Sequence, residues 1–435
     1  MHTHEITLKA AFLYWLKLGF ISFGGPAGQI ALMHTELVEK RRWISEARFL
    51  HALNYCMLLP GPEATQLAIY IGWLMHKNRG GIMAGLLFVL PGLLILMLLS
   101  WIYMVFGDNT VLKAMMSGIK PAVVAIVLAA AWRIAQRTLK TRVLVVVALA
   151  AFVAIAWLHL PFPLVIIAAA CTGLVFRKYC NTKESVHHQT THQHLPAIID
   201  DDTPTPEHAR FSWLKLIFTL SMGAMFAVSV WLLLACSFSL HHPLADMASF
   251  FSKAAILSFG GAYAVLPYMV QAAVEQYHWL STAQMMDGLA LGETTPGPLI
   301  MIVAFVGFIG GWNQAFLGGG HLLLAASLGA SVACFFTFLP SFIFILAGGP
   351  LVESGRNNLH LNAPLNAISA AVVGVIISLV WLFACHVFFK DVASLNIQAI
   401  VLTALASVAV FKFKLSTVRL LAASASAGYL LSLLS

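Results

Sequence analysis

Charged residues are scarce in this chain of 435 residues. They make up 10% of it, against about 25% in soluble domains, while hydrophobic residues make up 60%. So few charges cannot cover a water-facing surface, which excludes an ordinary soluble enzyme and indicates a membrane protein. The apolar runs approach the roughly 20 residues that a helix needs to cross a bilayer. The period-two alternation of a membrane β-barrel is absent, so we predict an all-α integral membrane protein embedded in the lipid bilayer.

Patterns typical of cofactor and nucleotide sites are also lacking. The six cysteines include no Cys-x-x-Cys pair, and we interpret them as small buried hydrophobic residues. No Gly-x-x-x-x-Gly-Lys-Ser/Thr motif is present, so the chain does not itself hydrolyse ATP. We therefore expect no cofactor, no metal and no enzymatic activity, and we expect ion gradients to supply the energy. The opening residues, Met-His-Thr-His-Glu, lack the features of a cleaved signal peptide, and we interpret them as the mature start.

The net charge of +8 has a topological explanation. The basic residues lie in short loops between apolar runs, where the positive-inside rule places them, so nucleic acid is not an expected partner. The one long polar stretch, residues 179–210, contains an acidic run at 200–202 and five histidines. A His-rich tract can bind a divalent metal, but these histidines have no regular spacing, and we predict a solvated, disordered cytoplasmic linker.

An internal repeat is the most informative feature. Ser22-Phe23-Gly24-Gly25 recurs as Ser258-Phe259-Gly260-Gly261, and Pro60-Gly61-Pro62 recurs as Pro296-Gly297-Pro298, both shifted by 236 positions. The same shift carries Lys17 onto Lys253. Further along, a shift of 249 carries Pro91 onto Pro340. Two homologous halves follow, and we divide the chain into a first transmembrane repeat (1–178), the linker (179–210), an extra transmembrane helix (211–238) and a second repeat (239–435).

The number of crossings predicts how the halves are oriented. Each half has two segments that carry the motifs (8–40 and 46–76; 246–276 and 284–312), followed by four ordinary spans. The single extra span then inverts the second half relative to the first, which is the inverted-repeat plan of many secondary transporters. If the motif segments are re-entrant hairpins, most basic loops fall on the cytoplasmic side and mainly Lys390 remains opposite. A pair of full crossings per segment gives the same parity and stays open.

The glycine and proline motifs predict broken helices inside the membrane. Proline lacks a backbone donor and glycine permits unusual dihedral angles, so the following helix starts with free N–H groups. Those groups and the positive end of the helix dipole suit an anion. A single such motif is more often a kink or a close helix contact. Because both motifs recur at a fixed spacing, we predict four helix ends around one central anion site.

Polar residues near these motifs are the candidate ligands. Lys17 and Lys253 lie five residues before Ser-Phe-Gly-Gly, and a lysine at membrane depth needs a partner unless it reaches the interface. Glu63 follows the first Pro-Gly-Pro and Glu293 precedes the second; each is a helix cap or a proton carrier. The predicted substrate-binding residues are Lys17, Ser22, Gly24, Gly25, Gln29, Asn54, Gly61, Thr65, Gln66, Lys253, Ser258, Gly260, Gly261, Thr294, Thr295 and Gly297.

These same residues carry a family resemblance. Lys17 through Ser-Phe-Gly-Gly-Pro, the run Leu-Pro-Gly-Pro-Glu-Ala-Thr-Gln-Leu at 59–67, and their copies in the second half resemble the chromate ion transporter family in its long, two-domain form. The resemblance implies chromate export across a bacterial inner membrane, driven by the proton-motive force and giving chromate resistance, with sulfate as the structural analogue. The halves differ at two positions, since Glu63 corresponds to Leu299 and Gln66 to Ile302.

The mechanism that we expect is alternating access to a tetrahedral dianion near the midplane, with Glu63 or Glu293 exchanging protons. Three alternatives remain at this stage. The first is an importer of sulfate or another oxyanion, because no residue rule separates it from chromate. The others are a passive anion channel and a membrane chromate reductase, of which the reductase would need a redox cofactor.

Overall fold

The computed structural model describes residues 6–23, 25–176, 197–200, 203, 206–238, 242–259, 262–354, 362–391 and 394–434. The first half contains α1 (Leu8–Ile21), α2 (Gly25–His34), the π-helix η1 (Thr35–Lys40), α3 (Glu46–Cys56), α4 (Glu63–Phe106), α5 (Thr110–Thr138), α6 (Arg142–Ala156) and α7 (Phe162–Val175). A short 3-10 turn, η2 (Glu207–Ala209), and α9 (Trp213–Ser237) connect it to the second half.

The second half repeats this order. It contains α10 (Pro243–Leu257), α11 (Ala262–Val270), the π-helix η3 (Gln271–Gln276), α12 (Thr282–Thr294), η4 (Leu299–Met301), α13 (Ile302–Gln314), η5 (Gly319–His321), α14 (Leu322–Ser354), α15 (Asn362–Phe388), α16 (Ile397–Phe411) and α17 (Thr417–Leu434). A two-stranded antiparallel ribbon, β1 (Phe389–Asp391) with β2 (Ser394–Leu395), joins α15 to α16. The π-helices η1 and η3 are related by the same 236-residue shift as the motifs.

Local sequence explains where several helices begin. The side-chain oxygens of Ser45, Asn109 and Thr141 accept hydrogen bonds from backbone N–H groups in the first turns of α3, α5 and α6. Ser281 and Gln284 form a reciprocal capping box at the start of α12. These caps satisfy backbone donors that would otherwise be left without partners at a helix start.

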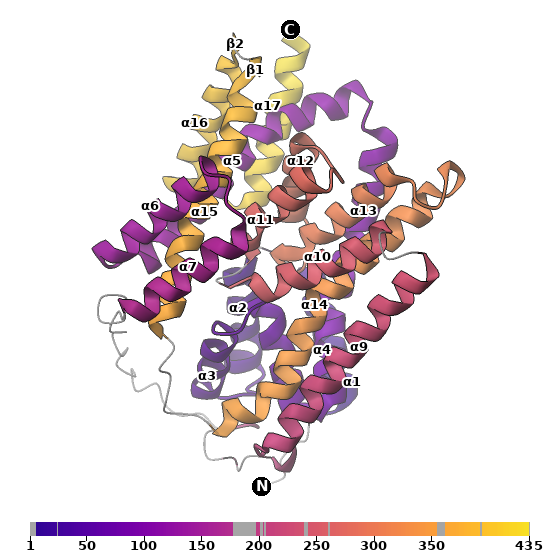
Figure 1. The fold of residues 1–435 in the computed structure, drawn as a ribbon, viewed down its shortest axis with the longest axis vertical. Helices are drawn as coiled ribbons and strands as arrows, with labels where there is room; N and C mark the ends of the chain where they lie inside the picture. Colours follow the sequence, from indigo (N-terminus) through magenta and orange to yellow (C-terminus); the bar gives the residue numbers. More distant parts are fainter. Residues whose placement is uncertain are drawn as a thin grey trace.

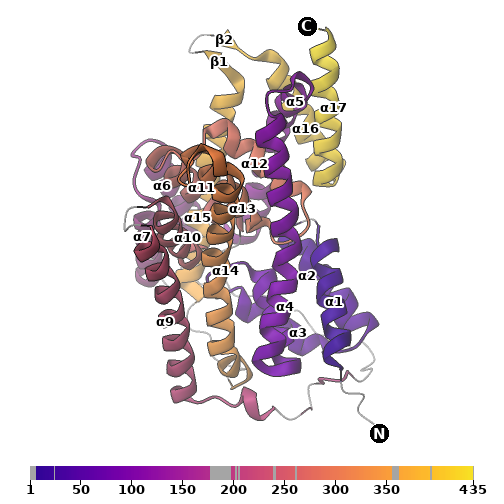
Figure 2. The ribbon, with the colours of Figure 1, turned by 90° about the vertical axis from the view of Figure 1, so that its right-hand side faces the viewer.

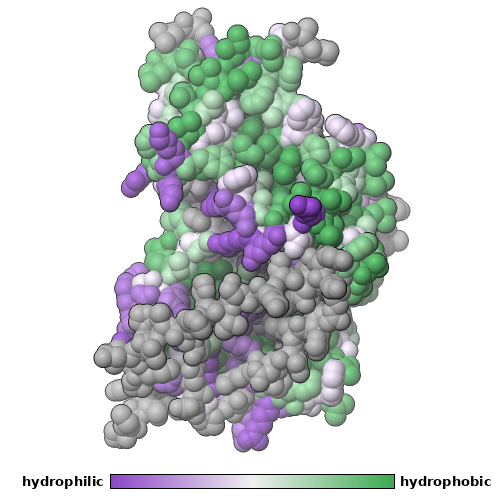
Figure 3. Space-filling view, turned by 90° about the vertical axis from the view of Figure 1, so that its left-hand side faces the viewer, coloured by the Kyte–Doolittle hydropathy of each residue, from purple (hydrophilic) through white to green (hydrophobic). Residues whose placement is uncertain are grey.

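Among the residues that the structure describes, five helices are long and apolar enough to cross a membrane, and their spans are Glu63–Phe106, Thr110–Thr138, Trp213–Ser237, Gly319–Glu353 and Pro364–Phe388. The protein is therefore a multi-pass membrane protein of all-α type. The apolar side chains of α9 are exposed along its length, Leu214 by 81% and Phe218 by 67%, as expected of a helix that faces lipid. One face of the molecule likewise presents a broad hydrophobic area with a hydrophilic group near its middle (Figure 3).

The predicted breaks are present. α1 ends at Ile21 before α2 begins at Gly25, and α3 ends at Cys56 before α4 begins at Glu63. We predicted that one segment ends at residue 76 and the next begins near 82. The structure bears out this boundary, because the stretch labelled α4 is two helices that meet at His76 and Lys77, which leave the helical conformation, and Lys77 has φ +54°.

The two halves exchange helices. α5 of the first half packs against α16 and α17 of the second, while α15 of the second half packs against α6 and α7 of the first. Figure 1 shows α5 and α15 in the midst of the other half's helices, and Figure 2 shows α16 and α17 beside α5 at one end with α1 and α3 beside α4 at the other. This reciprocal packing buries apolar surface between the halves, and one apolar core contains residues of both.

Part of the predicted linker is docked on the first half. Ile199 forms a parallel bridge with Ile44, and the Ser45 N–H donates to the Ile199 carbonyl at 3.0 Å. The expectation of a solvated linker is therefore wrong for the described residues 197–200, 203 and 206–210, because their backbone groups find partners in the protein. Residues 179–196 lie outside the described part of the chain, as do four of the five histidines.

Candidate functional site

The two kinds of motif meet across the halves. The backbone N–H of Gly61 donates to the Ser258 carbonyl oxygen at 3.0 Å, and the N–H of Gly297 donates to the Ser22 carbonyl oxygen at 2.9 Å. Because Gly61 corresponds to Gly297 and Ser22 to Ser258, the two hydrogen bonds are the same contact made in both directions. Each Pro-Gly-Pro break therefore rests on the Ser-Phe-Gly-Gly break of the opposite half.

Glycine is required at the centre of each Pro-Gly-Pro. Gly61 has φ +125° and Gly297 has φ +106°, conformations that other residues rarely adopt. A Cβ atom on Gly61 would lie 2.5 Å from Ser341 Oγ, and a Cβ atom on Gly92 would lie 2.6 Å from the Pro296 carbonyl oxygen. Gly92 and Ser341 are equivalent positions of the two halves under the 249-residue shift. Each lies against the Pro-Gly-Pro break of the opposite half and fills the space beside it.

Five fully buried polar side chains gather around these contacts: Ser22, Gln29, Thr65, Gln66 and Ser341. The Gln66 amide donates to the Pro60 carbonyl at 2.7 Å, and the Gln29 amide donates to the Gly297 carbonyl, so each glutamine holds a Pro-Gly-Pro break. Within the described residues, four atoms of this group have no hydrogen-bond partner, namely Gln29 Oε1, Thr65 Oγ1, Gln66 Oε1 and Ser341 Oγ. Each such atom costs about 1–3 kcal/mol when buried, which is typical of a site that binds a polar ligand or water.

Other predicted ligands serve their own helices. The hydroxyls of Ser22, Ser258, Thr294 and Thr295 donate to backbone carbonyls three or four residues earlier, at the ends of α1, α10 and α12. Asn54 is exposed on α3. Gly25, with φ +71°, begins α2. Gly24, Gly260 and Gly261 lie outside the described residues.

The two predicted lysines lie on exposed positions of α1 and α10. Lys17 is close enough to Glu36 on η1 for their charges to interact. The structure thus brings neither lysine into contact with the buried polar group, and their part in attracting an anion stays a prediction.

The two predicted carboxylates occupy different positions. Glu63 is the first residue of α4, where the positive helix end favours a negative charge, and the charge of Arg137 on α5 acts on it. Glu293 is in the last turn of α12, where the helix dipole opposes a negative charge; there it accepts a hydrogen bond from Tyr263, and the charge of Arg133 acts on it. Arg133 and Arg137 are one turn apart on α5, so one helix supplies a cation to each carboxylate.

The sequence interpretation missed two buried ionic clusters. In one, Tyr103 donates to Asp287 Oδ2 at 2.9 Å, and Lys120 Nζ lies 3.7 Å from the same oxygen. In the other, Tyr70 donates to Glu353, and Arg48 Nη1 lies 3.9 Å from Glu353 Oε2. The only signal in the sequence was a charged residue inside an apolar stretch, and no spacing rule joins residues so far apart.

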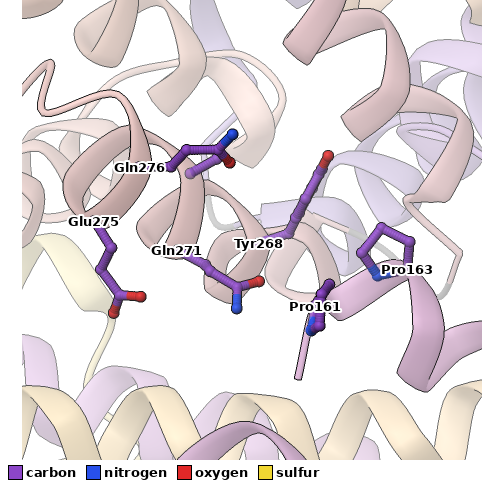
Figure 4. Close-up of a pocket in the computed structure, with 7 residues that line it drawn as sticks. Pro161, Pro163, Tyr268, Gln271, Glu275 and Gln276 are labelled. Carbon is purple, nitrogen blue, oxygen red and sulfur yellow. The ribbon is translucent and has the colours of Figure 1, made fainter. Parts of the chain in front are cut away.

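A further cavity of about 330 Å³ lies between the start of α7 and the helices α11 and η3. Figure 4 shows Gln271 pointing toward Pro161, with Tyr268 and Glu275 around it. Gln271 Oε1 accepts from the Phe162 N–H at 3.2 Å, which caps the start of α7.

Among the described residues, no group of three or more His, Cys, Asp or Glu side chains is placed to hold a metal.

Comparison with known proteins assigns the chain to a family. The sequence profile described as Chromate transporter matches residues 9–174 and 245–429, one match in each half. The chain belongs to the chromate transporter family. A chromate transport protein of Pseudomonas aeruginosa is 31% identical over 432 residues, which cover 96% of this chain and 91% of that protein. One of Cupriavidus metallidurans is 29% identical, covering 85% and 81% of the two chains.

A probable chromate transport protein of Synechococcus elongatus is 27% identical, over 86% of this chain and 84% of that protein. No solved structure is significantly similar. The family match confirms the resemblance drawn from Ser-Phe-Gly-Gly and Pro-Gly-Pro, and it places the chain in a family of membrane transporters.

Proposed function

We propose that this protein is a secondary active transporter that exports chromate from the bacterial cytoplasm across the inner membrane, driven by the proton-motive force, and so confers chromate resistance. The chromate transporter profile in both halves supports the substrate. The observation that carries the mechanism is the reciprocal pair of hydrogen bonds, Gly61 to Ser258 and Gly297 to Ser22, beside buried polar atoms that have no partner among the described residues.

The proposed substrate site lies where the four breaks meet. A tetrahedral dianion has only acceptor oxygens, so it needs donors, and the hydroxyls of Thr65 and Ser341 are buried there with no partner in the described part of the chain. The first backbone N–H groups of α4 lie at the N-terminus of this helix, where the positive end of the helix dipole favours an anion. In the structure the broken helix ends of the two halves are in contact, so the site is closed. These helix ends must separate to admit the ion.

We also propose that the halves have inverted topology and that the motif segments are re-entrant. α1 has 14 residues and α3 has 11, which at 1.5 Å per residue gives about 21 Å and about 17 Å, less than the roughly 30 Å of a bilayer core. A pair of such helices can enter and return on the same side. α9 is then the single unmatched crossing that inverts the second half.

Protons are the proposed coupling ion, with Glu63 and Glu293 as candidate carriers. Both are partly buried, and each interacts with one arginine of α5, so loss or gain of a proton changes a local charge balance. Sulfate has the same shape and charge as chromate, and we expect it to compete.

The proposal is tested in cells. Bacteria that are sensitive to chromate should accumulate less labelled chromate when they produce this protein, and should accumulate it normally when they produce a Thr65→Val, Ser341→Ala variant at the same membrane level. A protein that lowers accumulation equally well with and without these two hydroxyls would show that the substrate site lies elsewhere. Unchanged accumulation with the native protein would contradict export.

A further inference from the structure

Two buried clusters, each of an acid, a tyrosine and a base, join the halves. The first, called here the Glu353 cluster, consists of Glu353 on α14, Tyr70 on α4 and Arg48 on α3. The second, called the Asp287 cluster, consists of Asp287 on α12, Tyr103 on α4 and Lys120 on α5. In each cluster the acid connects a helix of one half to a helix of the other.

The clusters occupy corresponding places in the two halves. The 236-residue shift relates His51 to Asp287, and the 249-residue shift relates Val352 to Tyr103. His51 Nε2 lies 2.9 Å from the Val352 carbonyl oxygen, beside Glu353, and Tyr103 Oη lies 2.9 Å from Asp287 Oδ2. The same pair of positions therefore meets where α3 contacts α14 and where α12 contacts α4, although the residue types differ.

The clusters differ in access. The Asp287 cluster opens into a cavity of about 420 Å³, which is also lined by Lys113, Ser117, His386 and Asn396. The side chain of Lys120 is 27% exposed there. In the Glu353 cluster, by contrast, the side chains of Arg48 and Glu353 are only 5% and 3% exposed.

A segment that belongs to neither repeat covers the Glu353 cluster. Arg48 Nη2 donates to the Thr203 carbonyl oxygen at 2.5 Å. The Ile198 N–H donates to the Arg42 carbonyl at 2.9 Å, and the Ile199 N–H donates to the Trp43 carbonyl at 3.1 Å, just before α3. His208 packs edge-on against Trp73 of α4. The described residues 197–200, 203 and 206–210 are called here the cover.

Neither cluster satisfies its polar atoms fully. Within the described chain, Glu353 Oε2, Arg48 Nε, Arg48 Nη1 and Asp287 Oδ1 are buried without a hydrogen-bond partner. A buried ionic group that exists only to stabilise a fold gains most when all its partners are in place, and an incomplete one is costly. These clusters therefore suit a contact that forms and breaks during a cycle.

We propose that the Glu353 and Asp287 clusters are the two gates of the transport path, and that both contacts are made in this state, with the cover holding the Glu353 gate shut and the Asp287 gate bordering its cavity. The inference rests on the transport function proposed above. When the Glu353 gate opens, the Arg48–Glu353 contact breaks, α3 moves from α14 and the cover leaves Arg48.

Cys56 reports the state of the Glu353 gate. It lies on α3, two turns beyond Arg48, is fully buried, and lies near Tyr70 of the cluster. A full-length variant that retains Cys56 alone, with Cys171, Cys180, Cys236, Cys334 and Cys385 replaced by serine or alanine, is placed in lipid nanodiscs. The rate of Cys56 labelling by a membrane-impermeant maleimide is then measured.

Two independent changes should open the gate. Glu353→Gln removes the charge that pairs with Arg48, and Ile199→Pro removes the cover's N–H donor to Trp43. We expect each to raise the labelling rate at least about tenfold, because a gate held by contacts of this size loses roughly 1.4 kcal/mol or more of its closing free energy. Ile199→Val, which keeps the donor, and Asp287→Asn, in the opposite cluster, should leave the rate near that of the parent.

The outcomes separate this inference from the proposed function, because labelling needs no chromate. An unchanged rate in both Glu353→Gln and Ile199→Pro, with the parent's gel-filtration profile, would overturn the gate assignment. An equal rise in Asp287→Asn would also overturn it, since it would indicate general loosening. If the rate rises as expected but labelled chromate does not move, the gate stands and the substrate proposal fails. Should Ile199→Pro not fold, Glu353→Gln decides the matter alone.

Discussion

The N–H of Gly61 donates to the carbonyl oxygen of Ser258, 197 positions along the chain and in the other half of the protein, at 3.0 Å. Its counterpart runs from Gly297 to Ser22 at 2.9 Å. The halves are thus joined at their broken helices by backbone groups, which do not depend on side-chain identity. The proposed site lies where these contacts join the two halves. Movement of one half relative to the other must therefore alter the geometry of the site.

Gly61→Ala should destabilise the protein. A positive φ costs an alanine about 1–2 kcal/mol, and its Cβ would also lie 2.5 Å from Ser341 Oγ and 2.6 Å from Gln66 Nε2. We expect a lower melting temperature by fluorescence-detected gel filtration and loss of transport. Gly297→Ala should cost less, because its nearest neighbour would be 3.4 Å away, and Gly319→Ala, which meets nothing within 4 Å, should be neutral. Equal stability of all three variants would contradict the tight packing of the breaks.

Thr65→Val should impair transport without unfolding the protein. Valine matches the shape of threonine but removes a buried hydroxyl that has no partner among the described residues, so the empty protein loses no hydrogen bond. A missing bond to the bound ion should lower the transport rate at low substrate about tenfold. Thr172→Val, on the exposed face of α7, is the matched control. A Thr65→Val protein that transports like the control would remove this hydroxyl from the site.

Lys17→Gln and Lys253→Gln should act through attraction rather than contact. Both side chains are exposed, so their charges raise the local anion concentration without binding the ion at the breaks. We expect the KM for chromate to rise about threefold, with little change in the maximal rate, and the effect to shrink at high ionic strength. A collapse of the maximal rate in these variants would show that the lysines contact the ion after all.

The cover should loosen in acid. Burial against Trp73 lowers the pKa of His208 below its ordinary value of 6.5, and its Nε2 lies 3.2 Å from the Trp73 carbonyl oxygen. As the pH falls below 6.5, the His208 imidazole is protonated in the unfolded chain before it is protonated in the folded chain. The free energy of unfolding therefore decreases, and it stops decreasing for this reason once the pH is below the pKa of the folded state. The native protein should therefore lose more melting temperature than His208→Gln between pH 7 and pH 5.5. Parallel curves for the two proteins would contradict the buried neutral ring.

The positions of the breaks were predictable because their cause is local. Glycine and proline in Ser-Phe-Gly-Gly and Pro-Gly-Pro prevent a continuous helix wherever they occur, and the second copy at the same spacing removed the alternative of a chance kink. The roles of Gln29 and Gln66 were predictable only in part. The sequence indicated that they lie near the motifs, but that they are buried and that their amides hold the Pro-Gly-Pro carbonyls depends on how the helices meet.

The ionic clusters and the cover could not be predicted in this way. Asp287 and Tyr103 are brought together only because α12 packs beside α4, and a single sequence carries no record of that contact. Ile198 and Ile199 belong to a short apolar run within a polar stretch, which is a weak sign of docking, and the surrounding charges favoured a solvated interpretation. Lys17 and Lys253 lie at exposed positions of α1 and α10, and the part in attracting an anion that their place in an apolar run suggested stays a prediction.

Transport of labelled chromate into inside-out membrane vesicles tests the central claim most directly. With the protein present, a proton gradient directed as in the cell should drive accumulation above equilibrium, which collapses when the gradient is dissipated and is inhibited by excess sulfate. Uptake that only equilibrates, at a rate independent of the gradient, would show a passive pathway and contradict the coupled carrier proposed here.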